Sequence, residues 1–249
     1  MVLKMIKLSV IIPVYNESSR VLPTLDDIYS YLEKQDYQYE VLIVNDGSSD
    51  NTVKIVKEKI KNLPAGRQGW SGFKVIDNKK NQGKGAVVKQ GMLESQGEWR
   101  LFMDADNAYN IRILDNLWPY SKNYEVIIAS RYIKGAKLLT PIPLSRKLLS
   151  RLGNILIQIL VAWGIKDTQC GFKLFSKQAT KEIFRKQTMM RWSFDIELVA
   201  IAKKHKFDIK EVPIDWKVEK GSKLKVAQTA SRTLKDLLIV KWNLIKGKY

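Results

Sequence analysis

The chain has 249 residues, of which 45% are apolar and 27% charged, and its formal net charge is +18. This is the composition of an ordinary globular protein, and the length suffices for one large α/β domain or two small ones. A single cysteine and a single histidine exclude an internal disulfide framework and argue against a zinc site or a Ser-His-Asp triad, so any metal should have oxygen ligands.

Apolar runs rich in Val and Ile alternate with segments of helical spacing along the first 130 residues. We predict strands at 8–15, 40–46, 73–77, 99–104 and 125–130, and helices at 19–35, 50–62, 83–96 and 110–121. The alternation predicts an α/β fold with a mainly parallel sheet and helices on both of its faces. A loop is expected at 62–73, and amphipathic helices are expected toward the C-terminus.

Polar and ionisable residues follow four of the predicted strands. They are Tyr15-Asn16-Glu17, Asp46-Gly47-Ser48, Asp104 with Asp106, and Ser130-Arg131. Because ligands of such sheets bind outside the carboxyl ends of the strands, these residues should converge on one edge.

Asp104 and Asp106 end an apolar strand and are separated by the small Ala105. Along an extended chain the two carboxylates point the same way, and their repulsion is relieved by a divalent cation. Oxygen ligands favour Mg²⁺ or Mn²⁺. The alternative is a pair of solvated loop acids.

The segment Asn81-Gln82-Gly83-Lys84-Gly85 stands just before a predicted helix. Its glycines would let the backbone approach a phosphate, and a helix N-terminus attracts anions. Since both the P-loop spacing and a Gly-x-Gly-x-x-Gly fingerprint after the first strand are absent, a mononucleotide diphosphate bridged by metal fits better than a dinucleotide.

The positive charge is concentrated in the second half of the chain. No acidic residue occurs from Val126 to Lys166, and nine Lys or Arg lie between Lys217 and Tyr249. Nucleic acid, an anionic membrane surface and phosphorylated substrates could all explain this charge. A basic amphipathic helix at 145–163 favours the membrane interface, with a core or oligomer helix as the alternative. Without a secretory signal or a spanning run, we expect a cytoplasmic protein attached peripherally to the membrane.

Several segments together resemble a known family. They are "SVIIPVYNE", "VLIVNDGSSDNT", "NQGKGAV", "FMDADNA" and "ASRY", followed by "DTQCGFKLF", "RWSFDIELVAIAKK" and "EVPIDWKVEKGSKL". The first five, in this order, resemble the family-2 glycosyltransferases with the GT-A fold. The later three resemble the polyprenyl-phosphate hexose synthases, and most of all the dolichyl-phosphate β-glucosyltransferases.

The resemblance implies inverting transfer of a hexose from a nucleotide sugar to a polyprenyl or dolichyl phosphate at the cytoplasmic membrane face. On the donor side it assigns Pro13, Tyr15, Glu17 and Asp46 to the nucleoside pocket and Lys84 to the base or diphosphate. It assigns Asp104 to the sugar nucleotide and the metal, and Asp106 to the metal. On the acceptor side it assigns Arg131, Arg146 and Ser150 to the acceptor phosphate, and it places Asp195 and Glu197 at the sugar. It also implies a catalytic domain at 1–224, with a donor half at 1–130 and an acceptor half at 131–224, followed by a basic helix at 225–249.

Two departures from the family pattern affect the expected donor. Asn45 stands where the family often has an aspartate, so only Asp46 can carry the charged contact there. Ala108 stands where mannosyl relatives often have glutamine, which favours UDP-glucose over GDP-mannose. A mannosyltransferase, transfer to a growing glycan, and a non-enzymatic nucleic-acid-binding protein remain as alternatives, and a homo-oligomer is left open.

Overall fold

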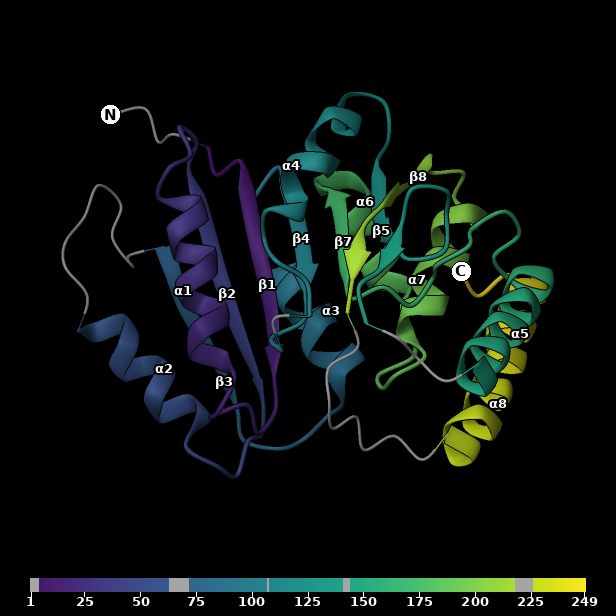
Figure 1. Ribbon diagram of the computed structural model, residues 1–249, viewed down its shortest axis with the longest axis horizontal. Helices are drawn as coiled ribbons and strands as arrows, with labels where there is room; N and C mark the ends of the chain where they lie inside the picture. Colours follow the sequence, from purple (N-terminus) through teal and green to yellow (C-terminus); the bar gives the residue numbers. More distant parts are fainter. Residues whose placement is uncertain (1–4, 63–71, 107, 141–143, 218–225) are drawn as a thin grey trace.

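The computed structural model describes residues 5–62, 72–106, 108–140, 144–217 and 226–249, with the backbone alone at 144–149 and 226–230. Its centre is a seven-stranded sheet of order β3-β2-β1-β4-β7-β5-β8 (Figure 1). The strands are β1 Leu8–Val14, β2 Tyr39–Asp46, β3 Phe73–Asn78, β4 Trp99–Met103, β5 Val126–Ser130, β7 Phe172–Ser176 and β8 Ile209–Pro213. A second sheet pairs β6 Lys137–Leu138 with β9 Asp215–Trp216.

The five predicted strands are confirmed, and β1 to β4 pair in parallel as expected. The strand β7 was not predicted, and it lies between β4 and β5, antiparallel to both. Two antiparallel pairings in succession leave β4 and β5 pointing the same way. The polar residues that follow β1, β2, β4 and β5 therefore share one edge of the sheet.

Helices cover both faces of this sheet, as predicted (Figure 1). The α-helices in the described part of the chain are α1 Val21–Leu32, α2 Thr52–Lys61, α3 Lys84–Glu94, α4 Ile113–Leu117, α5 Leu144–Leu160, α6 Lys177–Lys186, α7 Phe194–Lys204 and α8 Val226–Ile245. The helix predicted at 110–121 is divided into α4 and a 3₁₀ helix, Trp118–Lys122. Pro119 is the physical reason, since it lacks the amide proton that a continuing α-helix needs.

The helices α5 and α8 pack together at the end of the molecule beyond β8 (Figure 1). Helix α5 ends at Leu160, three residues before the predicted boundary. Helix α8 is fastened to α7, because Ser193 Oγ donates a 2.6 Å hydrogen bond to Asp236 and the hydroxyl of Tyr249 donates one of 2.7 Å to Glu197. The division of the chain at residues 130 and 224 stays a prediction. Among the described helices, none combines the length and apolarity needed to cross a membrane.

Candidate active site

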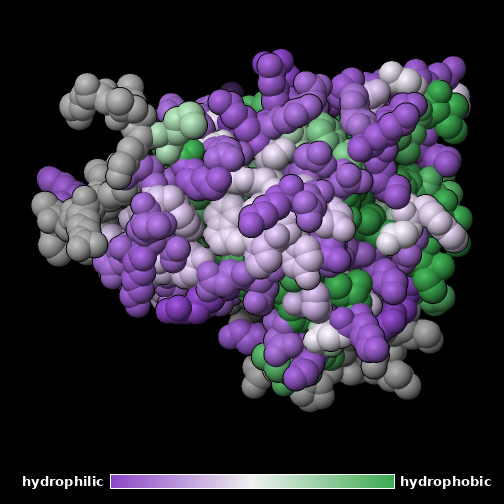
Figure 2. Space-filling view, turned by 90° about the horizontal axis from the view of Figure 1, so that it is seen from above, coloured by the Kyte–Doolittle hydropathy of each residue, from purple (hydrophilic) through white to green (hydrophobic). Residues whose placement is uncertain are grey.

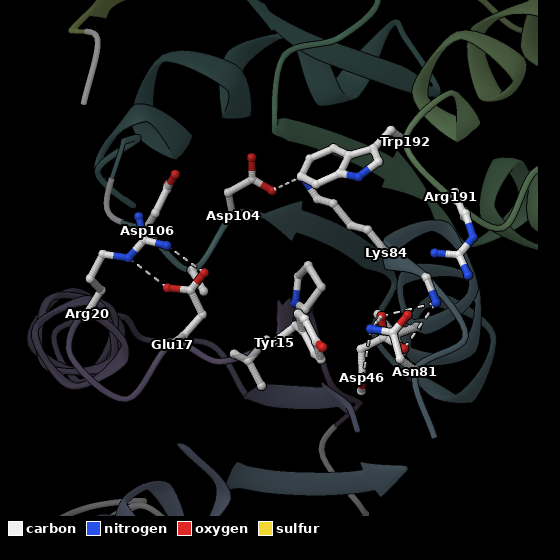
Figure 3. Close-up of a pocket in the computed structure, with 15 residues that line it drawn as sticks. Tyr15, Glu17, Arg20, Asp46, Asn81, Lys84, Asp104, Asp106, Arg191 and Trp192 are labelled. Carbon is white, nitrogen blue, oxygen red and sulfur yellow. Dashed lines mark hydrogen bonds and ion pairs between the residues drawn. The ribbon is translucent and has the colours of Figure 1, made fainter. Parts of the chain in front are cut away.

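A cleft of about 520 Å³ opens at the carboxyl ends of the parallel strands (Figure 3). It is lined by Pro13, Val14, Tyr15, Glu17, Arg20, Asp46, Asn81, Gly83, Lys84, Val87, Asp104, Ala105, Asp106, Arg191 and Trp192. All seven residues that the sequence assigned to the donor lie among them. The structure therefore brings together side chains from β1, β2, α3 and β4 at one place.

The turn after β1 is set by Asn16, which has a left-handed φ of 55°. Asparagine tolerates this conformation better than most residues. Its backbone N–H donates to Ser48 Oγ at 3.0 Å, and its side-chain oxygen accepts from the backbone of Ser49 at 2.9 Å. These bonds join the loops that follow β1 and β2, so the half-exposed Tyr15 is held at the cleft.

The carboxylate of Asp46 accepts the hydrogen bonds of the N–H groups just before α3. It accepts hydrogen bonds from the backbone of Gln82 at 2.6 Å and of Gly83 at 3.0 Å, and from the side chain of Asn81 at 3.0 Å. These N–H groups were expected to meet a phosphate, but the protein's own carboxylate occupies them. Asp46 still lines the cleft beside them.

Close packing is a further reason for the two glycines near Lys84, and the expected phosphate contact stays a prediction. A Cβ at Gly83 would lie 2.4 Å from the carbonyl oxygen of Met190, and a Cβ at Gly85 would lie 2.6 Å from that of Met189. Contacts this short are not tolerated. The glycines are needed because the chain between α6 and α7 passes directly against the start of α3.

Asp104 pairs with Lys84, whose Nζ lies 2.6 Å from Asp104 Oδ1. Burial lowers the pKa of Lys84, but the charges of Asp104 and Asp195 raise it, and the pKa ends above its usual value. The ammonium group is thus held in its charged form. On its other side, Asp104 packs against Gly171 so closely that a Cβ there would lie 2.0 Å from Asp104 Oδ2.

Asp106 and Glu17 share the acidic end of the cleft with Asp104. Burial raises the pKa of Asp106, and the charge of Asp104 raises it further. Burial also raises the pKa of Glu17; Arg20 opposes this shift, and Asp106 and Asp104 add to it. Both carboxyl groups are thus partly buried, and each has other negative charges nearby.

The charges of the cleft fit a divalent cation. Four carboxylates and three basic side chains line it, so its net charge is negative although the protein's is strongly positive. Among the described residues, no group of three His, Cys, Asp or Glu has the geometry of a complete metal site. Asp104 and Asp106 would supply two ligands, and Mg²⁺ commonly takes the rest from water and substrate phosphates.

Asp195 and Glu197, which the resemblance placed at the sugar, do not line the cleft. Asp195 is buried and pairs with the fully buried Lys173. Glu197 is fully buried and accepts hydrogen bonds from Thr188, Met189 and Tyr249.

Arg131 and Ser150, which were expected at the acceptor phosphate, lie outside the cleft as well. Arg131 makes a two-pronged ion pair with the fully buried Asp167, with N–O distances of 2.7 and 2.8 Å. Ser150 Oγ lies 2.8 Å from the hydroxyl of Tyr132, the residue next to Arg131. The side chain of Arg146 lies outside the described residues.

Four polar or aromatic residues of the cleft were missed from the sequence, namely Arg20, Asn81, Arg191 and Trp192. Asn81 belongs to the quoted segment "NQGKGAV", and Arg191 and Trp192 begin the quoted segment "RWSFDIELVAIAKK". No spacing in the sequence connects the pair to the strand ends.

The fold and the cleft define the class of protein as a glycosyltransferase of the GT-A fold. Glucosyl-3-phosphoglycerate synthase from Mycobacterium tuberculosis, in complex with Mn²⁺, uridine-diphosphate and phosphoglyceric acid, is similar with a TM-score of 0.69 at 14% identity, over 94% of this chain and 78% of that one. Mannosyl-3-phosphoglycerate synthase from Rubrobacter xylanophilus is similar with a TM-score of 0.70 at 14% identity, over 98% and 76%. At these identities the likeness concerns the fold.

Residues 9–184 match the model of glycosyl transferase family 2, and the chain belongs to this family. A dolichyl-phosphate beta-glucosyltransferase of Trichomonas vaginalis is 38% identical, over 87% of this chain and 66% of its own length. Those of Dictyostelium discoideum and Homo sapiens are 34% and 33% identical, over 97% and 98% of this chain and 76% and 77% of theirs. The resemblance seen in the motifs is confirmed, and an enzyme replaces the nucleic-acid-binding alternative.

Proposed function

We propose that the chain transfers a hexose, with glucose favoured, from a nucleotide sugar, with UDP-glucose favoured, to a dolichyl or other polyprenyl phosphate. The observation that carries this proposal is the relation to three dolichyl-phosphate beta-glucosyltransferases, which extends over 87% or more of the chain. The cleft agrees with a nucleotide-sugar donor, because apolar and aromatic side chains line it together with the carboxylates of Asp104 and Asp106.

In this proposal Pro13, Tyr15 and Asp46 receive the nucleoside, and Lys84 meets the diphosphate. Asp104 and Asp106 would hold Mg²⁺ or Mn²⁺, which would neutralise the charge that develops on the leaving diphosphate. Lys84 adds a second positive charge at the same place, since it already lies 2.6 Å from Asp104. The donor is a dianion, and the cation offsets the repulsion between it and the acidic end of the cleft.

The acceptor needs no strong general base. A phosphate monoester is already an anion at neutral pH. Its oxygen attacks the anomeric carbon as the bond from that carbon to the diphosphate oxygen breaks, and the nucleoside diphosphate leaves. A single displacement of this kind inverts the configuration at the anomeric carbon.

Arg131 is suited to bring the acceptor anion to the donor. Asp167 binds its Nε and one terminal nitrogen, and we assign the other terminal nitrogen to the acceptor phosphate, with help from Ser150 and Arg146. Burial and then Cys170 raise the pKa of the Tyr109 hydroxyl, and the charges of Arg131 and Asp104 both act on it. This supports an acceptor position close to the donor carboxylates.

The acceptor's prenyl chain calls for a lipid surface, and α5 and α8 offer one. Both helices expose large apolar side chains along one side, which gather at one edge of the molecule in Figure 2. These are Leu152, Ile155, Leu156, Ile159 and Trp163 with Leu234, Leu238, Ile239, Trp242 and Ile245. We call them the apolar platform.

The sequence predicted this stripe of α5 but left a core helix as the alternative. The structure buries the opposite side of α5, through Ile157 and Val161, and leaves the larger stripe exposed. The same segment carries basic residues, namely Arg232, Lys235 and Lys241 in α8 and Lys246 directly after it. Apolar area beside basic charge fits an anionic bilayer, and the free, buried Cys170 agrees with its cytoplasmic face.

Transfer can be measured directly. The purified chain is incubated with Mn²⁺, dolichyl phosphate and radiolabelled UDP-glucose or GDP-mannose, and label is counted in the lipid extract. We expect label from UDP-glucose, as a product cleaved by a β-glucosidase. Label from GDP-mannose alone would correct the donor, and the absence of transfer to any polyprenyl phosphate would overturn the proposal.

Membrane binding has its own test, vesicle flotation with and without phosphatidylserine. Leu152→Gln combined with Ile159→Gln should reduce recovery with anionic vesicles about tenfold. Leu93→Gln is the control, because Leu93 is a partly exposed leucine of α3, outside the platform. Equal recovery for wild type and double variant would refute the lipid assignment. If the wild type is a dimer and the double variant is a monomer, the platform is an oligomer interface instead.

A further inference from the structure

Strand β7 carries a lysine, Lys173, in the interior of the main sheet. It lies between Phe102 of β4 and Ile128 of β5, and none of its side chain is exposed. Its Nζ donates a hydrogen bond of 2.8 Å to the carbonyl oxygen of Cys170 and pairs with the carboxylate of Asp195, at the start of α7. An ammonium group can be buried only with such partners, because an unpaired charge in the interior is costly.

The core does not need these two charges for its stability. The side chains on either side of the lysine, Phe172 and Leu174, are fully buried and apolar. Replacing a buried ion pair by apolar residues of similar size is often neutral or stabilising, because the attraction between the charges hardly exceeds the cost of removing them from water. A lysine at this position is therefore best explained by what its two partners hold.

The first partner, the carbonyl group of Cys170, belongs to the stretch of backbone that lies against Asp104. The next residue, Gly171, accepts the backbone N–H of Asp104 at its carbonyl oxygen, at 3.1 Å. A Cβ at Gly171 would also overlap the carboxylate of Asp104. Since Lys173 binds the residue directly before this contact, its hydrogen bond fixes the surface on which the Asp104 carboxylate rests.

The second partner, Asp195, acts on Lys84, the lysine that pairs with Asp104 in the cleft. Burial raises the pKa of Asp195, and the charges of Lys173 and then Lys84 oppose this shift. The ammonium groups of Lys84 and Lys173 each lie 5.5 Å from the centre of the Phe102 ring. Charges of alternating sign therefore lead from the core to the cleft, in the order Lys173, Asp195, Lys84 and Asp104.

We infer that Lys173 and Asp195 are positioning residues of the donor site, which hold Asp104 and Lys84 in place from behind. This inference rests on the proposed nucleotide-sugar donor. It gives Asp195 a different role from the contact with the sugar that the sequence motifs implied. It also accounts for a charged pair inside the sheet, where an apolar pair would pack as well.

The test replaces the pair by apolar residues, Lys173→Met together with Asp195→Leu. The net charge of the protein is then unchanged, so an altered affinity reports a change of position and not of the overall field. Lys173→Met alone should lower the melting temperature by about 10 °C, because it leaves a buried carboxylate unpaired. The double variant should melt within about 5 °C of wild type.

Binding and turnover are measured with Mn²⁺, at a temperature at which circular dichroism shows the double variant to be folded. By calorimetry it should bind UDP about tenfold more weakly than wild type, and uridine, measured by competition, within about twofold. Its kcat/KM for transfer from UDP-glucose to dolichyl phosphate should fall about 10²-fold. Lys173→Gln with Asp195→Asn keeps the net charge and hydrogen-bonding groups, and should recover part of both losses.

Arg100→Met is the matched control. Arg100 is a buried cation of the neighbouring strand β4, and it also donates to a backbone carbonyl group, that of Ser95, at 2.8 Å. It lies near the start of β4, at the end of the strand away from Asp104, and it does not line the cleft. The control should lower the melting temperature and leave UDP affinity and kcat/KM within about twofold of wild type.

The outcomes separate this inference from the proposed function. A folded double variant with wild-type UDP affinity and kcat/KM would overturn it, because the pair would then serve the core alone. An equal loss for uridine and UDP would overturn it as well, since it would indicate a general disturbance of the cleft. If the double variant does not fold, the glutamine and asparagine variant decides by the same criteria. If wild type binds neither UDP nor UDP-glucose, the proposed donor fails and the inference fails with it.

Discussion

Replacing Gly171 by alanine tests whether the position of Asp104 is decisive for activity. Gly171 does not have a left-handed φ, so its backbone conformation accepts any residue. The obstacle is contact alone: the new Cβ would lie 2.0 Å from Asp104 Oδ2 and 2.5 Å from its Cγ. Ordinary contacts between carbon and these atoms are more than 1 Å longer. Asp104 must therefore turn away, which breaks its 2.6 Å ion pair with Lys84.

A displacement of about 1 Å in a catalytic group costs on the order of 10²-fold in rate, or about 3 kcal/mol of transition-state stabilisation. We expect this loss in kcat/KM for transfer from UDP-glucose to dolichyl phosphate. Inserting one methyl group into a packed site also lowers the free energy of unfolding by about 1–3 kcal/mol. Thermal melting by circular dichroism checks that the variant is folded at the assay temperature.

Gly153→Ala is the matched control, because no atom lies within 4 Å of a Cβ built at Gly153 in α5. It should leave kcat/KM unchanged. A folded Gly171→Ala variant with wild-type kcat/KM would show that Asp104 can move without consequence, and would refute its role at the donor.

Three further predictions concern single residues. Asp106→Asn should lower turnover about 10²-fold and abolish the stimulation of UDP-glucose binding by Mn²⁺ in calorimetry; it should not lower the melting temperature, since burial and the charge of Asp104 already raise the pKa of Asp106. Unchanged dependence on Mn²⁺ would remove Asp106 from the metal site. Arg131→Ala should lower the free energy of unfolding in urea by about 3–5 kcal/mol, because it leaves the fully buried Asp167 without its partner, and Arg131→Lys should lower it less. A loss below about 1 kcal/mol would show that water or another group reaches Asp167. Burial, followed by the charge of Asp167, raises the pKa of the Cys170 thiol to about 12, so a disulfide reagent at pH 8 should modify the urea-unfolded chain and leave the folded protein unmodified.

The elements of the donor half could be predicted because their signals are local. Runs such as Leu8–Val14 and Tyr39–Asp46 are buried along their whole length, and an apolar stretch of that kind followed by a polar turn defines a strand and its end. The strand β7 was missed because it carries Lys173. That lysine is fully buried only because it pairs with Asp195, 22 residues later in the chain.

The amino-acid sequence by itself determined the sheet edge and the residues that gather there, from Tyr15 to Asp106, because strand ends follow from short-range patterns. Only the tertiary structure decided which charges are free to act. It pairs Arg131 with Asp167, 36 residues away, and it places the Asp46 carboxylate on the N–H groups before α3. It leaves Arg191 in the cleft without a partner among the described residues. It also decided which side of α5 is buried, since Ile157 and Val161 make the C-terminal end of this helix apolar opposite the exposed stripe as well. Ion pairs and burial depend on contacts between distant segments, and the spacing of residues along the chain carries no information about them.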